Sequence, residues 1–495
     1  MPSREGIRML ARTPSLRRSS ILVVPLILTL SLAGLGAPSA TAEDGVPGSV
    51  QQVYYAGEAS GAGSIPSTPI PDCKDEPDDP PDCWRGAKLL LDANPIGQTA
   101  AEPTIGVAND GTAYMAGSTM VVDTPFVWGV AKTDARRSTD GGLTWTSIQP
   151  VVPGANERIP PGNADPMIWL DTTTSRIFTF DLTSACQWLS YSDDKGVNWI
   201  HNPLACGNVP ADHQSIVTGK PRNGLPTLNY PNVIYWCSNR VVDNPCGRSI
   251  DGGLTFHTTL SSAFTPQTAC RGLSGHVEAD PDGRIFLPTS QTCGQPWVAR
   301  SEDNGDSWTR HQISTMSSAN THTSIGTDSA GNLYYVWINS SGGTILPYLS
   351  TSTDHGTTWS EPKMIAPPGV LQANYPVVAG GAPGHVAISF PSATSTASNR
   401  PWSQTVVITT DALSADPVFL SATANPPTDP IHRGACTGRC GGLWDFIDIQ
   451  ISSLGQAWVA TSDDCVGSCN TGTVSATHVG DGIAVRQIGG PSLRP

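Results

Sequence analysis

A short motif repeated five times constrains this 495-residue chain more than any other feature. Each copy has Ser, Asp and Gly at alternate positions and an aromatic residue three positions after the Gly, and successive aspartates are 51 to 57 residues apart. The five aspartates are Asp140, Asp194, Asp251, Asp303 and Asp354. This spacing matches the length of a four-stranded propeller blade, so the sequence predicts an all-β propeller.

Within each motif the Asp carboxylate is expected to accept hydrogen bonds from its own tight turn, and the Gly to supply a positive φ. The aromatic residue is expected to pack between neighbouring sheets. A structural role is therefore favoured over a catalytic one for the five aspartates.

The number of blades follows from counting the units between the motifs. Strand-like stretches and a turn precede each motif, as in residues 275–301 and 323–350. Two further units, 376–419 and 445–489, lack a clean motif, with Asp411 in one and Asp481-Gly482 in the other standing in its place. Five units plus two favour a seven-bladed propeller of four-stranded antiparallel blades, with six blades as the alternative.

The five copies resemble the Asp-box, or bacterial neuraminidase, repeat, and residues 100–490 resemble the sialidase-like propeller superfamily. The resemblance implies that each box joins the third and fourth strands of a blade, on the face opposite the active site. Sialidases have six blades, and the motif also occurs in binding proteins, so the resemblance implies the fold more strongly than an activity.

The N-terminal region has the pattern of an export signal. Five Arg precede an apolar run from Ile21 to Leu35, and Ala40-Thr41-Ala42 is a small-residue cleavage site. We expect residues 1–42 to be a signal peptide and residues 43–99 an extension carrying an acidic, Pro-rich loop. Loss of a net +4 would change the chain's −14 to about −18, which disfavours nucleic acid and anionic membranes as partners. We expect a secreted monomer that binds an extracellular glycan.

All twelve cysteines follow the cleavage site, and in an exported chain an even number of cysteines indicates disulfides. Sequence neighbours are the expected pairs for the first eight: Cys73 with Cys83, Cys186 with Cys206, Cys237 with Cys246, and Cys270 with Cys293. The pairing of Cys436, Cys440, Cys465 and Cys469 stays open, and a zinc site formed by these four is the alternative.

The propeller geometry predicts where functional side chains meet. The innermost strand of every blade starts at one face, so the residues that open these strands are expected to converge on a central cup. The set contains Glu102, Asp165, Asp212, His213, His276, Glu278, His322, Tyr375, Asp445 and Asp448. Such a set supplies acids, bases and metal ligands in one place.

Three functions compete for this cup. In a sialidase-like hydrolase, the resemblance implies a Tyr nucleophile, an activating Glu and an Asp acid/base, and Tyr375, Glu278 and Asp165 are the candidates, with Glu102 as an alternative acid/base. It also implies three Arg on the sugar carboxylate. Arg240, Arg271 and Arg400 are the candidates, but their register is open. We also expect His276 and Asp445 to be catalytic, and Glu102, His213 and His322 to bind substrate.

The second function is a polysaccharide lyase acting on uronates. His213, His276 and His322 would hold a divalent cation or take a proton next to the uronate carboxylate. A hard cation such as calcium would favour the oxygens of Asp212, Asp445 and Asp448. The third function is a non-catalytic module that binds a glycan or protein. We rank the hydrolase ahead of the lyase, and the binding module third.

Overall fold

The computed structural model describes residues 53–495 except 57, 60–68, 82, 120–132, 151–163, 184–185, 203–211, 241, 258–259, 269, 291, 320–321, 341–343, 437–445 and 473–479. The described residues all belong to the unit Pro47–Pro495. The expected signal peptide lies outside them. No helix in the described part of the chain is long and apolar enough to cross a membrane.

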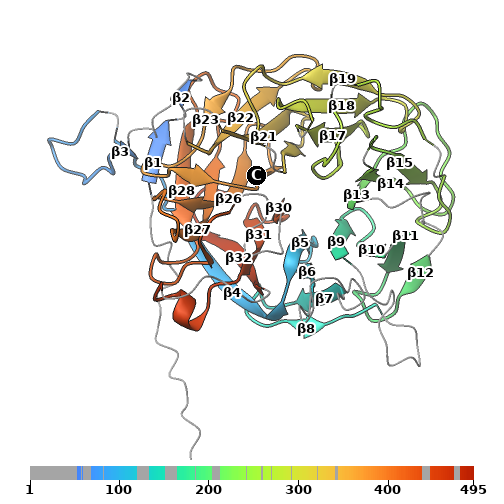
Figure 1. The fold of residues 1–495 in the computed structure, drawn as a ribbon, viewed down its shortest axis with the longest axis horizontal. Helices are drawn as coiled ribbons and strands as arrows, with labels where there is room; N and C mark the ends of the chain where they lie inside the picture. Colours follow the sequence, from blue (N-terminus) through green and yellow to red (C-terminus); the bar gives the residue numbers. More distant parts are fainter. Residues whose placement is uncertain are drawn as a thin grey trace, which may run out of the picture. The chain divides into compact units, whose positions relative to one another are not determined.

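Seven antiparallel sheets form a closed ring, which confirms the seven-bladed propeller (Figure 1). Their innermost strands contact one another in sequence around the ring, and the last strand contacts the first. These strands are β5 (Ala101–Val107), β9 (Ala164–Asp171), β13 (Asp212–Gly219), β16 (Glu278–Ala279), β20 (Ser324–Thr327), β25 (Val377–Gly380) and β30 (Asp448–Ile451). Side chains from seven distant segments are thereby brought to one axis.

Blades 1 to 5 are built in chain order from β5 to β23, as four strands in most blades and three in blade 3. The second strands are β6 (Ala113–Ser118), β10 (Arg176–Thr183), β14 (Val233–Asn239), β17 (Ile285–Thr289) and β21 (Leu333–Asn339). The third strands are β7 (Thr133–Ser138), β11 (Cys186–Ser192), β15 (Cys246–Ser249), β18 (Trp297–Ser301) and β22 (Leu346–Ser352). The outer strands are β8 (Thr146–Ser147), β12 (Ile200–Asn202), β19 (Thr309–Gln312) and β23 (Lys363–Met364).

Blade 6 contains β25, β26 (Val386–Ala393), β27 (Pro401–Thr409) and β28 (Val418–Thr423), with short strands β24 (Gln372–Ala373) and β29 (His432–Arg433) at its margins. Blade 7 contains β30, β31 (Ala457–Asp463) and β32 (Asp481–Gly489). Asp481-Gly482 therefore begins the third strand of blade 7 and does not replace a box turn, because Asp481 pairs with Asp463. The strand expected at 474–478 lies outside the described residues.

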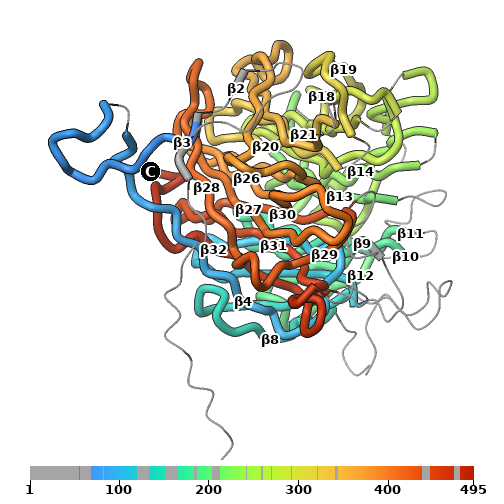
Figure 2. The backbone as a smooth tube through the Cα atoms, turned by 60° about the vertical axis from the view of Figure 1, so that its left-hand side comes forward, coloured from blue at the N-terminus to red at the C-terminus, as the bar shows by residue number. Residues whose placement is uncertain are grey.

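The N-terminal region closes the ring. Strand β4 (Leu90–Thr99) pairs with β32 as the outermost strand of blade 7, and the two run side by side in Figure 2. Strand β1 (Val53–Ala56) pairs with β28 of blade 6 and with β3 (Pro69–Ile70), and β2 (Glu58–Ala59) extends blade 5. The propeller thus starts before residue 100, because its last blade takes its fourth strand from the predicted extension.

The box turns have the hydrogen bonds expected of a structural motif. The Oδ1 atom of Asp251 accepts hydrogen bonds from the hydroxyl of Ser249 (2.7 Å) and the backbone N–H of Thr255 (2.9 Å), and the Ser249 hydroxyl accepts one from the N–H of Gly253 (2.9 Å). In blade 6, Asp411 bonds with Thr409 (2.6 Å) and Val418 (3.1 Å) and closes the corresponding turn.

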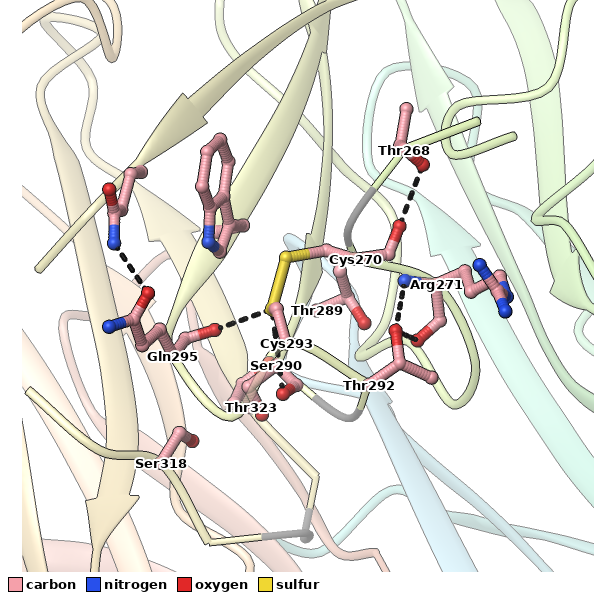
Figure 3. The surroundings of a disulfide bond; sticks show 12 residues. Thr268, Cys270, Arg271, Thr289, Ser290, Thr292, Cys293, Gln295, Ser318 and Thr323 are labelled. Atoms are coloured by element: carbon pink, nitrogen blue, oxygen red, sulfur yellow. Dashed lines mark hydrogen bonds between the residues drawn. A yellow bond between two sulfur atoms is a disulfide. The ribbon is translucent and has the colours of Figure 1, made fainter. Parts of the chain in front are cut away.

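Four disulfides lie within the described residues: Cys73–Cys83, Cys237–Cys246, Cys270–Cys293 and Cys465–Cys469. The first three are the pairs expected between sequence neighbours, and Figure 3 shows Cys270–Cys293. The fourth argues against the zinc alternative, because two of the four candidate thiolates are bonded to each other. Cys436 is also disulfide-bonded. The side chain of Cys186 and residues Cys206 and Cys440 lie outside the described residues.

Candidate functional site

One position recurs in the innermost strand of all seven blades. It lies five residues before a residue that pairs with the second strand close to the turn between the two strands; these reference residues are Val107, Leu170, Thr218, Ala279, Thr327, Gly380 and Ile451. We name it the entry position. Its occupants are Glu102, Asp165, His213, Ser274, His322, Tyr375 and Phe446. Four of them have a left-handed backbone although none is glycine: Glu102 (φ 52°), Asp165 (φ 47°), His213 (φ 49°) and Tyr375 (φ 44°). Such conformations cost energy, and they gather at functional sites and bulges.

The structure corrects the predicted register in two blades. In blade 4 the pair Ala279–Ile285 lies next to the turn, so Ser274 occupies the entry position and His276 and Glu278 lie two and four residues further along the strand. In blade 7 the corresponding residue is Phe446, with Asp448 two residues further. Asp445 lies outside the described residues. The prediction misplaced the blade 4 residues because it aligned the starts of the strands and did not count back from the turn.

Three imidazoles meet on the ring axis, around a phenyl ring. The ring centroid of His276 lies 4.8 Å from that of His322, and the centroid of His213 lies 5.9 Å from that of His322. Phe446 reaches from blade 7 to all three imidazoles, with centroid distances of 5.1 Å to His276, 5.7 Å to His213 and 6.0 Å to His322. We call these four residues the hub rings. His213, His322 and Phe446 are at most 5% exposed.

A cavity of about 430 Å³ lies along the axis beside the hub rings. Its lining comes from all seven blades and includes His276, Glu278 and Asp448, together with the indole of Trp169. It extends past these residues to the turns between the first and second strands. The predicted residues that share this axial cavity are therefore His276, Glu278 and Asp448.

Burial shifts the pKa of each of these three groups towards the uncharged form. Burial lowers the pKa of His276 to about 3, and His213 lowers it further while Asp165 opposes the shift. Burial raises the pKa of Glu278 to about 8, with smaller contributions from Asp448 and Asp280. Burial raises the pKa of Asp448 to about 7. At neutral pH the cavity thus holds a neutral imidazole and a mainly protonated Glu278.

Asp448 also has a structural function that the sequence analysis missed. Its Oδ2 atom accepts a hydrogen bond from the N–H of Ile105 in blade 1 (3.0 Å). At the same strand position, Thr104 accepts one from Ile168 (2.7 Å) and Ser215 accepts one from Val277 (2.9 Å). Asp448 therefore links blade 7 to blade 1 in the way that hydroxyl residues link other blades.

Other predicted residues lie away from the axial cavity. Tyr375 is 1% exposed and belongs to the apolar cluster of blades 6 and 7. It is at the entry position, whereas Glu278 is four residues deeper in its own strand, about 13 Å along the axis. The structure does not bring this Tyr and Glu together. Glu102 and Asp165 are buried at entry positions, and the N–H of His213 points to the Asp165 carboxylate at 3.4 Å. Asp212, one residue before His213, is exposed.

The three predicted arginines are held by their own loops in the described part of the chain. Arg240 donates two hydrogen bonds to Asp243 (2.8 and 2.6 Å). Arg400 donates to the carbonyl of Ala397 (2.9 Å) and lies over the ring of Trp402 (5.3 Å). The Arg271 backbone bonds to Thr292 beside the Cys270–Cys293 disulfide, and its side chain points away from that disulfide in Figure 3.

A metal site would need several ligand atoms within reach of one ion. Among the described residues, Cys73, Asp79 and Cys83 form the only group of three with ligand atoms within 4.8 Å of one another. Its two cysteines form a disulfide. The three hub imidazoles do not form such a group among the described residues.

No protein-family model and no curated protein match the chain. Among solved structures, a protein of unknown function from Dyadobacter fermentans is 16% identical, with a TM-score of 0.44, over 68% of this chain and 100% of that one. The NanB sialidase from Streptococcus pneumoniae is 12% identical, with a TM-score of 0.42, over 80% and 70%. A PL25 ulvan lyase is 10% identical, with a TM-score of 0.42, over 75% and 95%. At these values the similarities assign no activity to this chain.

Proposed function

We propose that the protein is a secreted enzyme that cleaves an acidic polysaccharide by proton transfer at the hub, as a lyase acting on a uronate. The observation that carries the proposal is the meeting of three imidazoles on the ring axis, one of which lines a cavity together with Glu278 and Asp448. Groups with shifted pKa values in a cavity are the usual components of acid–base catalysis. The disulfides support export to an oxidising compartment.

In such an elimination the base takes the proton next to the uronate carboxylate. The electrons of that C–H bond form a C=C bond, the bond to the leaving oxygen breaks, and that oxygen takes up a proton. The uncharged imidazole of His276 lines the cavity and is available as the base once the substrate is bound, because the substrate carboxylate raises its pKa from the value of about 3 in the empty cavity. The protonated carboxyl of Glu278 is available as a hydrogen-bond donor to the anionic substrate or as the proton source for the leaving oxygen.

The same geometry gives less support to the sialidase-like mechanism. That mechanism needs a Tyr beside its activating Glu, and Tyr375 and Glu278 lie at different depths in blades 6 and 4. It also needs arginines that converge on the substrate carboxylate, and Arg240 and Arg400 bond within their own loops.

A glycoside hydrolase using two carboxyl groups is the second candidate. Glu278 and Asp448 line the same cavity, and a protonated Glu278 has the form required of a general acid. This mechanism would hydrolyse the glycosidic bond with water and leave no double bond in the product.

The test is incubation of the purified mature protein with uronate-containing polysaccharides and with sialosides. A lyase produces unsaturated ends that absorb in the near ultraviolet, whereas a hydrolase produces reducing ends without this absorbance. We expect His276→Ala to lower the lyase rate roughly 10²–10⁴-fold, as for loss of a general base. The matched control is His257→Ala, since His257 is an exposed imidazole in the outer part of blade 3.

Three results would overturn the proposal. Full activity in His276→Ala would show that the His276 imidazole, and with it the hub, does not take part in the reaction. Reducing ends without ultraviolet absorbance would select the hydrolase. Glycan binding without any cleavage would make the propeller a binding module.

A further inference from the structure

We infer that Phe446 is a positioning residue, which fixes the imidazole of His276 and keeps water away from its hub side. This inference rests on the proposed function for its catalytic consequence. Its structural part is that Phe446 orients the His276 imidazole and excludes water from it, and this part can be tested without any substrate.

Phe446 differs in chemistry from the other residues at the entry position. Five of the seven occupants carry an ionisable or phenolic side chain and one is Ser274, whereas blade 7 supplies an apolar ring. Phe446 is 1% exposed, and blade 7 lies across the ring from blades 3 and 4, which supply His213 and His276. A hydrocarbon ring at this position cannot take part in proton transfer, so any role in the chemistry is indirect.

The contacts of Phe446 give it control over the orientation of the imidazoles. Its ring stands edge-on to all three, at interplanar angles of 79° to His276, 72° to His213 and 87° to His322. Edge-to-face packing at these distances is directional, because the positive edge of one ring meets the negative face of the other. The angle at which His276 meets the axial cavity is therefore set partly by a residue from another blade.

The surroundings of His276 consist of two parts. On the hub side it packs against the rings of His322 and Phe446, with His213 and the Asp165 carboxylate near enough to act on its charge. On the cavity side it shares the lining with Glu278 and Asp448. Phe446 is the only uncharged, non-titrating ring among these described neighbours, so its removal lets water reach the imidazole from the hub side and stabilises the charged form.

The experiment compares Phe446→Ala and Phe446→Leu with Phe419→Leu as the matched control. Phe419 is a buried phenylalanine of blade 6 that stacks on Tyr55 at 5.7 Å, away from the hub. Imidazole NMR signals are followed from pH 5 to 8, with His276 assigned by comparison with His276→Gln. In the parent protein and in Phe419→Leu, we expect the His276 signal not to titrate in this range.

In Phe446→Ala we expect His276 to titrate near its ordinary pKa of 6.5, because water replaces the phenyl ring. In Phe446→Leu, which keeps apolar volume but loses the ring edge, we expect kcat to fall roughly 10- to 100-fold with KM within about twofold, as for a misplaced catalytic group. The Phe419→Leu variant should keep its kcat.

Unchanged His276 titration in Phe446→Ala would overturn the inference, whether or not any substrate is found. Equal losses of kcat in the two Phe→Leu variants would also overturn it, since they would reduce Phe446 to an ordinary core residue. A protein with no lyase activity but with the expected shift in titration would refute the proposed function and leave the structural part of the inference supported.

Discussion

Carboxyl side chains lie in opposite environments at the box turns and in the axial cavity. At the boxes, Asp140 accepts hydrogen bonds from Thr144 and Ser138, and these bonds lower its pKa to about 2. In the cavity, Glu278 lies among apolar and acidic neighbours, and burial raises its pKa to about 8. One carboxyl is held as an anion by its turn, and the other is kept protonated by its surroundings.

This difference separates structural from functional acids in a repeat protein. The box carboxylates recur in five blades with the same partners, because each blade has the same turn to close. Glu278 has no acidic counterpart at its strand position, where blades 1, 5 and 6 have Gly106, Gly326 and Ala379. Glu278, the acid that departs from the repeat pattern, is therefore a better candidate for a catalytic residue than the box aspartates.

The largest expected contrast is in activity. We expect Glu278→Gln to lower the rate on the responsive polysaccharide roughly 10²–10³-fold at neutral pH, because an amide can donate a hydrogen bond but cannot transfer a proton as an acid does. The matched box variant Asp303→Asn should keep the parental rate. A Glu278→Gln variant with parental kcat and KM would show that Glu278 contributes no proton.

A second contrast is in the pH dependence of stability. The folded protein retains the Glu278 proton up to about pH 8, whereas the unfolded chain releases it near 4.5. The folded state thus binds more protons in between, and the free energy of unfolding falls as pH rises from about 5 to 8, on the order of 2–4 kcal/mol from this group.

Urea unfolding at pH 5, 6, 7 and 8 measures this slope. Glu278→Gln should have a flatter profile than the parent and should be the more stable of the two at pH 8. The boxes act in the opposite direction: Asp140, Asp194 and Asp354 have pKa values near 2, so their contribution is present above about pH 4 and is lost as pH falls from 4 to 2. Parallel profiles for parent and variant would contradict the raised pKa of Glu278.

The fold was predictable because the information that specifies it is local and repeated. Each box needs Ser, Asp and Gly within a few residues, so five turns and the blade length follow from the sequence directly. The closure of the ring was not predictable in this way. Strand β4 pairs with β32, almost 400 residues away, and neither segment carries a motif that identifies the other.

The site was predictable only in part, for a related reason. Convergence on the axis follows from the ring, and His213, His276 and His322 do meet there. Their depth along the axis depends on where each innermost strand turns, and a shift of two residues moves a side chain by about 7 Å. Counting back from the 280–283 turn would have assigned Ser274 to the entry position. Phe446 was missed because an apolar residue gives no chemical signal in the sequence.

The smallest expected effect concerns a single box turn. Asp251→Ala removes hydrogen bonds from the Ser249 hydroxyl (2.7 Å), the Thr255 N–H (2.9 Å) and the Thr255 hydroxyl (2.5 Å). We expect the free energy of unfolding to fall by about 1–2 kcal/mol, as for other lost capping bonds, with kcat unchanged. Asp251→Asn should lose less, because its amide oxygen still accepts a hydrogen bond.

Urea unfolding of the parent and both variants at pH 7 gives the three free energies, and the same samples are assayed for activity. If Asp251→Ala unfolds at the parental urea concentration, the box carboxylate does not stabilise its turn. If it loses kcat while its stability is unchanged, the box face takes part in the chemistry. That result would remove the distinction between turn carboxylates and cavity carboxyls, because an acid held as an anion by a repeated turn would then be functional as well.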